Sequence, residues 1–270
     1  MRRLKSCSYR KEKVSIMELG LKDRVALVTG SSRGIGRATA ELLGREGARV
    51  AVTYHTLRER GEAVAAGIRE RGGDAFAIQL DISSDQSIRN AVDAVVERWG
   101  KLHILINNAI HAGERAVAKS RFEEVPAEQW RDLLRGNFEG AHVAIGAVLP
   151  YMRRERWGRI VNVSSVVAAD GFPGGATYGA AKAALHGLTR TLAKELAPEG
   201  ILTNVVMPGL TLTEAVRRSM PEAVEQAARI SPIRHVPTSE EVAQVIVFVA
   251  SAANTTINGE IIRANGGAIA

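Results

Sequence analysis

Seven short runs rich in valine and isoleucine recur along the chain, and longer stretches with helical periodicity separate them. This alternation is the strongest constraint on the fold, because apolar strands joined by helical crossovers form a parallel sheet that is covered on both faces. The sequence therefore predicts an α/β, doubly wound, seven-stranded parallel sheet. The expected strands are residues 24–29, 49–54, 75–80, 103–108, 159–165, 201–206 and 260–265.

The chain is long enough for one large domain. Its 270 residues are 46% apolar, and no linker rich in proline, glycine or serine divides them. We expect a single domain over residues 17–270, preceded by a flexible basic extension over residues 1–16. Met17 is an equally good start, because the sequence after it leads directly into the first strand.

Charge and composition exclude several classes of protein. The net charge is +7, but the extension holds six basic residues and one acidic residue, which leaves only +2 for the rest. Such a body offers no broad basic face for nucleic acid. No apolar run is long enough to span a membrane, and the single cysteine, Cys7, allows no internal disulfide. We expect a cytoplasmic protein that binds neither nucleic acid nor membrane.

The first strand ends in "VTGSSRGIG", which places Gly30, Gly34 and Gly36 between a strand and a helix. Glycines at such a turn allow a pyrophosphate to approach the backbone, and the helix N-terminus offers free N–H groups and a positive dipole end. The alternative is an ordinary glycine-rich turn. The strand-turn-helix context favours a dinucleotide site.

The end of the second strand indicates which dinucleotide is preferred. A site for NAD places an acidic residue there, whereas this chain has Thr53, Tyr54, His55 and Thr56. Arg33, within the glycine array, can donate charge-assisted hydrogen bonds to a 2′-phosphate. These two features favour NADP(H) over NAD(H).

Tyr178 and Lys182 stand four residues apart in "TYGAAKAALHG", which a helix would bring onto one face. The alternative is a solvated helix face. A phenol exchanges protons poorly at neutral pH unless its anion is stabilised, and a nearby ammonium can supply that stabilisation. The pair is therefore a candidate proton donor. No group of side chains has the spacing of a metal site, so we expect no metal.

Several further motifs occur in a fixed order from residue 21 to the C-terminus: "TGSSRGIG", Asp81 after the third strand, "NNA" at 107–109, Asn137 in "GNFEG", "NVSS" ending at Ser165, "YGAAK" and "MPG". Together they resemble the short-chain dehydrogenase/reductases, a family with a Rossmann fold. Within that family the chain is most similar to the 3-oxoacyl-[acyl-carrier-protein] reductases.

This resemblance implies a catalytic set of Asn137, Ser165, Tyr178 and Lys182. Tyr178 would protonate the substrate carbonyl oxygen, Ser165 would bond the same oxygen, and Lys182 would hold the nicotinamide ribose. Asn137 would anchor a water that relays protons to the lysine. For Ser165 the alternative is a strand-end hydroxyl that bonds the backbone, and for Asn137 a polar residue at a helix bend.

The resemblance also implies an NADP(H) site and a homotetramer. The tetramer would pair through residues 126–153 and 177–197 and through the last strand. The expected cofactor-binding residues are Gly30, Ser32, Arg33, Gly34, Ile35, Gly36, Asp81, Ile82, Asn108, Ala109, Tyr178, Lys182, Pro208, Gly209, Thr211 and Thr213.

Three positions depart from the family pattern. Ile110 replaces the glycine of "NNAG", Thr211 stands where an aliphatic residue is common, and Asn265 replaces the aspartate of "DGG". None of them removes a catalytic group, but they leave the substrate open. His111, in the loop after the fourth strand, is expected to be solvent-exposed rather than a substrate contact.

The function expected from these residues is NADPH-dependent reduction of a 3-oxoacyl thioester or a similar ketone. An acidic acyl carrier protein could be steered by Arg153, Arg154 and Arg156, expected beside the site mouth, although Glu199 weakens that case. The alternatives are a ketoreductase of specialised metabolism acting on a free cyclic or polyketide ketone, and a catalytically silent dinucleotide-binding regulatory module.

Overall fold

A computed structural model describes residues 17–111 and 121–268, and a parallel sheet lies at the centre of this part of the chain. Within it the sheet has seven strands in the order β3-β2-β1-β4-β5-β6-β7, and every neighbouring pair is parallel. The prediction of a doubly wound seven-stranded sheet is confirmed. The strands are β1 (Val25–Val28), β2 (Arg49–Tyr54), β3 (Asp74–Gln79), β4 (Ile104–Asn107), β5 (Gly158–Val163), β6 (Ile201–Pro208) and β7 (Ile261–Ala264).

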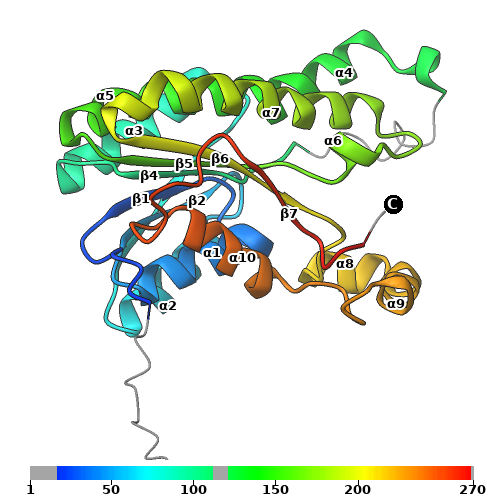
Figure 1. The fold of residues 1–270 in the computed structure, drawn as a ribbon, viewed down its shortest axis with the longest axis horizontal. Coiled ribbons are helices and arrows are strands. Elements are labelled where there is room, and N and C mark those ends of the chain that lie inside the picture. Colours follow the sequence, from blue (N-terminus) through cyan, green and yellow to red (C-terminus); the bar gives the residue numbers. More distant parts are fainter. Residues whose placement is uncertain (1–16, 112–120, 269–270) are drawn as a thin grey trace, which may run out of the picture.

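Helices cover both faces of the sheet (Figure 1). One layer holds α1 (Gly34–Arg45), α2 (Arg58–Glu70) and α10 (Ser239–Val249), and the other holds α3 (Asp85–Trp99), α5 (Gly140–Glu155) and α7 (Ala176–Leu196). Alternate residues of a strand face opposite layers. In β1, Ala26 and Val28 therefore pack in one hydrophobic core, and Val25 and Leu27 pack in the other.

Shorter elements connect this framework. α4 (Ala127–Leu134) runs into a π-helix, η3 (Arg135–Glu139), which leads directly into α5. At the carboxyl ends of the strands, α6 (Val167–Asp170) follows β5, and α8 (Glu214–Ser219) and α9 (Pro221–Ile230) follow β6 (Figure 1). Two 3₁₀ turns complete the described elements, η2 (Phe122–Glu124) and η4 (Ala197–Glu199).

The strand order reverses at β1, whose neighbours are β2 on one side and β4 on the other. In doubly wound sheets, ligands bind at the carboxyl edge of such a switch point. The glycine array lies at this edge, because it directly follows β1.

The predicted extension over residues 1–16, which includes Cys7, lies outside the described residues, and the division of the chain into extension and domain stays a prediction. Among the helices described, none is long and apolar enough to cross a membrane.

Candidate active site

The glycine array forms a tight turn between β1 and α1. Gly30 has a φ of +65°, and a Cβ there would lie 2.8 Å from the Ala109 Cα atom. A Cβ on Gly36 would lie 2.4 Å from the Gly30 carbonyl oxygen. Only glycine fits at these two positions, because the turn packs directly against the end of β4 and against its own backbone just before the N-terminus of α1.

Thr29 and Asn108 hold this turn against the end of β4. The Thr29 Oγ1 atom accepts hydrogen bonds from the backbone N–H groups of Asn108 and Ala109, each at 2.9 Å. The Asn108 side-chain amide donates to the carbonyl oxygens of Thr29 (2.9 Å) and Gly30 (3.2 Å). The sequence analysis named Asn108 and Ala109 but missed Thr29, whose only signal was its place before the first glycine.

A second set of bonds ties the turn to β2. The Gly30 N–H donates to the Thr53 Oγ1 atom at 2.8 Å, and the Thr53 N–H donates to the Ser31 Oγ atom at 2.7 Å. Thr53 is only 1% exposed, so its hydroxyl serves the turn and cannot face a ribose. Ser31 is a further supporting residue that the sequence did not single out, and Thr53, noted at the end of the second strand, has this supporting role instead of facing the ribose.

The remaining predicted phosphate-side residues lie at the start of α1. Arg33 is the exposed N-cap of that helix, and its side chain forms no hydrogen bond or ion pair with another described residue. Ser32 and Ile35 are partly buried beside it. Thr213 reaches the same place from the segment after β6, because a Cβ on Gly34 would lie 3.3 Å from the Thr213 Cγ2 atom. An exposed, unpaired guanidinium at a helix N-terminus suits a phosphate ligand.

Asp81 stands next to the end of β2, a neighbour that the sequence did not indicate. Its Oδ2 atom lies 3.7 Å from the His55 Nε2 atom, and its Oδ1 atom accepts hydrogen bonds from the Ser83 N–H (2.8 Å) and Oγ–H (2.6 Å). Burial acts to raise the pKa of Asp81, but the bonds from Ser83 and the charges of His55 and His111 outweigh it, so the pKa is lowered. The carboxylate is therefore charged at neutral pH, and Ile82, partly buried, follows it.

Tyr178 and Lys182 lie on α7, as the i, i+4 spacing predicts, and Ser165 follows β5 at the same sheet edge. Ser165 hydrogen-bonds the half-buried Tyr178, and its Oγ atom also accepts a bond from the Val167 N–H at 3.3 Å. The Lys182 ammonium donates to the Val163 carbonyl oxygen at 3.0 Å and is only 1% exposed. The fold thus brings these three predicted residues together.

Burial shifts the pKa of each residue of this pair in the direction that favours its neutral form. It raises the pKa of the Tyr178 phenol, which the Ser165 hydrogen bond opposes, and it lowers the pKa of Lys182 to about 8. The structure therefore does not show the lowered tyrosine pKa that the Tyr/Lys spacing suggested, because desolvation outweighs the hydrogen bond from Ser165. The phenol keeps its proton at neutral pH and is a proton donor.

Asn137 lies in η3 and is only 2% exposed. Its side-chain amide donates to the carbonyl oxygens of His111 (2.8 Å) and Leu133 (2.9 Å). Asn137 and Lys182 line one cavity of about 10 Å³, together with Thr29, Asn107 and Ala109 among others. That volume is about the size of a single water, and the lining supplies polar partners for it.

The segment after β6 closes the site from the C-terminal side. The Pro208 carbonyl oxygen accepts a hydrogen bond from the Val166 N–H at 3.0 Å, next to Ser165. The Thr211 hydroxyl is buried and donates to the Gly209 carbonyl oxygen at 3.1 Å. A Cβ on Gly209 would lie 3.0 Å from the Asn265 Cβ atom.

The structure explains one departure from the family pattern and locates another. Asn265 bonds the Ala268 carbonyl oxygen through its amide nitrogen, which an aspartate at neutral pH could not do. Ile110 is exposed, and His111 beside it is exposed as predicted. The backbone N–H and C=O groups of His111 both bond the Asn137 side chain, so this loop is fixed at the site even though its imidazole faces solvent.

The prediction that Arg153, Arg154 and Arg156 flank the site mouth is wrong for the site of the same chain. These residues precede β5, whereas Ser165 follows it, and a strand of six residues separates the two ends by about 20 Å. Arg153 is also paired with Glu199 at 2.6 Å, and Arg156 donates to the Pro198 carbonyl oxygen at 3.1 Å. The order along the chain places the arginines at the amino end of β5 and Ser165 at its carboxyl end, and the length of the strand keeps them apart.

No group of three or more histidine, cysteine or acidic side chains within residues 17–111 and 121–268 could hold a metal ion. The glycine turn before α1, the exposed Arg33 and the Ser165–Tyr178–Lys182 set instead define an oxidoreductase with a Rossmann fold.

Comparison with known proteins places the chain more narrowly. Residues 30–268 match the sequence model of a family described as "Enoyl-(Acyl carrier protein) reductase". The 3-oxoacyl-[acyl-carrier-protein] reductase FabG of Staphylococcus aureus is 38% identical over 242 residues, which cover 90% of this chain and 96% of that protein. FabG of Aquifex aeolicus is 37% identical over 253 residues, which cover 93% and 99%.

Two solved structures are also similar. A dehydrogenase/reductase from Sinorhizobium meliloti has a TM-score of 0.84 and 33% identity, over 94% of this chain and 98% of that one. LugOII, described as a promiscuous reductase that catalyses keto-reduction at C1 during lugdunomycin biosynthesis, has a TM-score of 0.85 and 36% identity, over 93% and 99%. The protein belongs to the short-chain dehydrogenase/reductase family, whose members are nicotinamide-dinucleotide-dependent oxidoreductases.

Proposed function

We propose that this protein is an NADPH-dependent reductase of a 3-oxoacyl thioester or a closely similar ketone. The observation that carries the proposal is the meeting of Ser165, Tyr178 and Lys182 at the sheet edge that also holds the glycine turn. A silent regulatory module would not need a buried lysine beside a half-buried tyrosine. The names of the FabG relatives support a 3-oxoacyl substrate.

The cofactor would lie along the carboxyl edge of the sheet. The glycine turn and the N-terminus of α1 suit its pyrophosphate, and Arg33 suits a 2′-phosphate. The negative Asp81 carboxylate beside His55 weighs against a preference for NADPH, because it would repel a 2′-phosphate. Its oxygens, however, already face Ser83 and His55. Lys182 would hold the nicotinamide ribose, and the segment of Pro208, Gly209, Thr211 and Thr213 would enclose the nicotinamide half.

When bound, NADPH would supply the hydride for the carbonyl carbon. Tyr178 donates its proton to the carbonyl oxygen, and the Ser165 hydroxyl donates a hydrogen bond to the same oxygen as charge develops on it. The Lys182 ammonium, one helical turn from Tyr178, stabilises the tyrosinate that is left. A water in the cavity shared by Asn137 and Lys182 would return the proton.

A second substrate class has its own support. LugOII acts in the biosynthesis of lugdunomycin, and the arginines expected to dock a carrier lie at the opposite sheet edge in this chain. Both observations favour a free polyketide or cyclic ketone. We also propose that the protein is a homotetramer and acts in the cytoplasm, as the resemblance to the carrier-protein reductases implies.

The test is the loss of NADPH absorbance with acetoacetyl thioesters, cyclic ketones and quinones offered in parallel. Turnover of the thioesters at the highest efficiency would support the first substrate class, and faster turnover of a cyclic ketone would support the second. Turnover of none of them, together with undetectable NADPH binding, would contradict the proposed function.

A further inference from the structure

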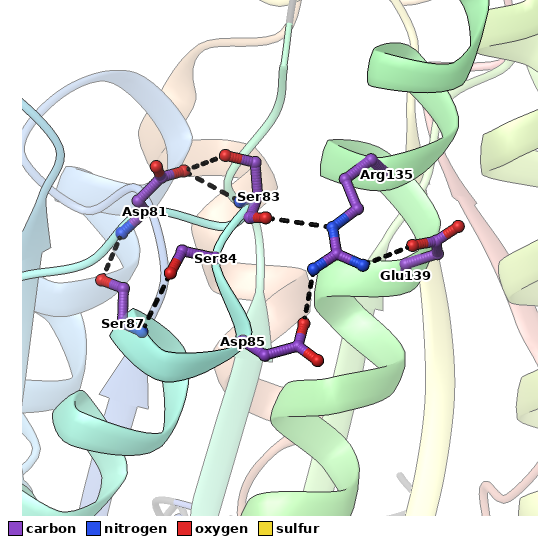
Figure 2. A network of polar contacts seen from close by, with 7 residues as sticks. All are labelled: Asp81, Ser83, Ser84, Asp85, Ser87, Arg135 and Glu139. Atoms are coloured by element: carbon purple, nitrogen blue, oxygen red, sulfur yellow. Dashed lines mark hydrogen bonds and ion pairs between the residues drawn. The ribbon is translucent and has the colours of Figure 1, made fainter.

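Arg135 is the first residue of η3, two positions before Asn137, and its guanidinium contacts both a distant segment of the chain and the end of its own helix (Figure 2). The Nε atom donates to the Ser83 carbonyl oxygen at 3.0 Å, and the Nη2 atom lies 2.7 Å from the Asp85 Oδ1 atom. The Nη1 atom donates to the Glu139 Oε2 atom at 2.7 Å, at the other end of η3. Three nitrogens of one planar fork therefore each have a separate acceptor.

The residues that Arg135 reaches belong to an ordered turn over residues 81–85, called here the 81–85 turn. Besides the two bonds from Ser83 to Asp81, the Asp81 N–H donates to the Ser87 Oγ atom at 3.0 Å. The Ser84 hydroxyl oxygen caps α3 by accepting from the Ser87 N–H at 3.2 Å (Figure 2). These bonds tie Asp81 to the rest of the turn and to the start of α3.

Backbone packing brings η3 close to the same turn. A Cβ on Gly140, the residue after η3, would lie 2.2 Å from the Ile82 carbonyl oxygen, and one on Gly136 would lie 2.5 Å from the His111 Cβ atom. At Gly140 the backbone of the 81–85 turn therefore lies directly against the end of η3.

We propose that Arg135 is a positioning residue that fastens the 81–85 turn to the π-helix, so that ligand contacts at Asp81 and the placement of Asn137 are coupled. The inference rests on the proposed function, in which Asp81 faces the cofactor and Asn137 holds the relay water. Asn137 has its amide fixed to His111 and Leu133, so any shift of η3 changes where it stands in the cavity beside Lys182.

The alternative is a set of surface ion pairs without consequence. Exposed pairs contribute little one at a time, and the Arg135, Asp85 and Glu139 side chains are 38%, 49% and 50% exposed. Networks and fork geometry are the circumstances in which such pairs matter. Two of the three acceptors are also more than 45 residues away, so the contacts join separate elements and do not merely support one helix.

Hydrogen exchange of the protein without cofactor tests whether Arg135 holds the 81–85 turn and η3 together, without any assay of activity. In Arg135→Gln, amides of both the 81–85 turn and residues 135–140 should exchange roughly three- to fivefold faster, the factor expected for loss of a surface network. Arg49→Gln is the matched control, because it breaks an equally exposed long-range pair with Asp23 at the opposite sheet edge. It should leave both segments unchanged.

Addition of NADPH tests the coupling itself. In the wild type, NADPH should protect both segments, whereas in Arg135→Gln it should protect the turn but no longer residues 135–140. Single-turnover hydride transfer at saturating NADPH should then slow by roughly threefold to fivefold, and Arg135→Lys, which keeps the charge without the fork, should lie between the two.

Unchanged exchange in Arg135→Gln, or faster exchange confined to residues 135–140, would show that Arg135 does not hold the two segments together. Asp85→Asn is a second test, since it removes the charge of one of the two contacts between η3 and the turn and leaves the Arg135–Glu139 pair intact. If the wild type binds no NADPH, the proposed function fails, but the exchange of the free variants still decides whether Arg135 joins the two segments.

Discussion

The Lys182 ammonium nitrogen lies 5.9 Å from the centroid of the Tyr178 ring, one turn further along α7. The lysine is completely enclosed, and its described hydrogen-bond partner is the carbonyl oxygen of Val163 at the end of β5. A buried ammonium with a single neutral partner is costly unless a charge develops nearby. The arrangement therefore suits a reaction in which Tyr178 becomes an anion for a short time.

Replacing Tyr178 by phenylalanine removes the proton donor and little else. We expect Tyr178→Phe to keep the fold and NADPH binding while turnover falls by at least about a hundredfold, the usual contribution of a general acid. Steady-state assays and cofactor titration measure the two effects. Tyr151→Phe, on α5, is the matched control and should keep full activity. Near-normal turnover of the Tyr178 variant would show that another group protonates the substrate.

Arg33→Ala should change the choice of cofactor. Loss of one charge-assisted contact to a 2′-phosphate should narrow the preference for NADPH over NADH by about 1 to 3 kcal/mol. Arg37→Ala is the control, because Arg37 is exposed on the same helix but already pairs with Glu41 at 3.0 Å. The measurement is kcat/KM with each cofactor, and equal or better kinetics of the wild type with NADH would contradict the assignment.

Stability should depend on pH through His103, which is buried at the amino-terminal side of β4. Its Nδ1 atom accepts from the Val25 N–H at 3.0 Å, and burial, with help from Arg24, lowers its pKa to about 4. Between about pH 6.5 and pH 4, His103 is therefore protonated in the unfolded chain but neutral in the folded chain. The stabilising effect is complete above pH 6.5 and is lost progressively as the pH falls toward 4.

We expect the free energy of unfolding to fall by about 1 to 3 kcal/mol across that window because of His103. His103→Asn keeps an acceptor near the Val25 N–H without a titrating ring, so its stability should depend less on pH between 6.5 and 4. Burial and Arg190 also lower the pKa of His186, so the stability of the His103 variant should still depend on pH to some extent. Urea unfolding at several pH values gives the comparison, and identical slopes for wild type and variant would rule out this role of His103.

The homotetramer expected from the resemblance would use the edge strand β7 and the exposed sides of α5 and α7. β7 pairs only with β6 in the described sheet, and its Ile261 and Ile262 are partly exposed. An unpaired edge with apolar side chains is commonly covered by another chain. Light scattering at micromolar concentration should give four times the mass of one chain, and a monomer would contradict the prediction.

The sequence was sufficient for the fold because each strand contains a short apolar run, and each of the seven expected runs became a strand of the sheet. It also predicted that Tyr178 and Lys182 would share one helix face, since that depends only on local spacing. It could not reveal the nearness of His55 to Asp81 or of Arg135 to Ser83, which depends on how distant segments pack. The π-helix at Asn137 likewise has no periodic signal of its own.

The last prediction concerns delivery of the substrate by an acidic carrier protein. Arg217 and Arg218 are exposed on α8, which begins directly after Thr213 at the site edge, whereas Arg156 stands at the far end of β5. If a carrier is steered by charge, kcat/KM for a carrier-bound 3-oxoacyl substrate should fall with added salt and with Arg217→Glu. Arg156→Glu should leave this kcat/KM unchanged if the carrier contacts only the subunit whose site it serves.

A free acetoacetyl thioester is the internal control, because screening and charge reversal should not affect a substrate that needs no steering. A selective loss of carrier-bound activity in Arg156→Glu would mean that this arginine acts at the site of another subunit, which the tetramer would have to bring there. If salt and both substitutions have no effect while a free cyclic ketone is reduced faster, carrier delivery is excluded and the specialised ketoreductase is the function that remains.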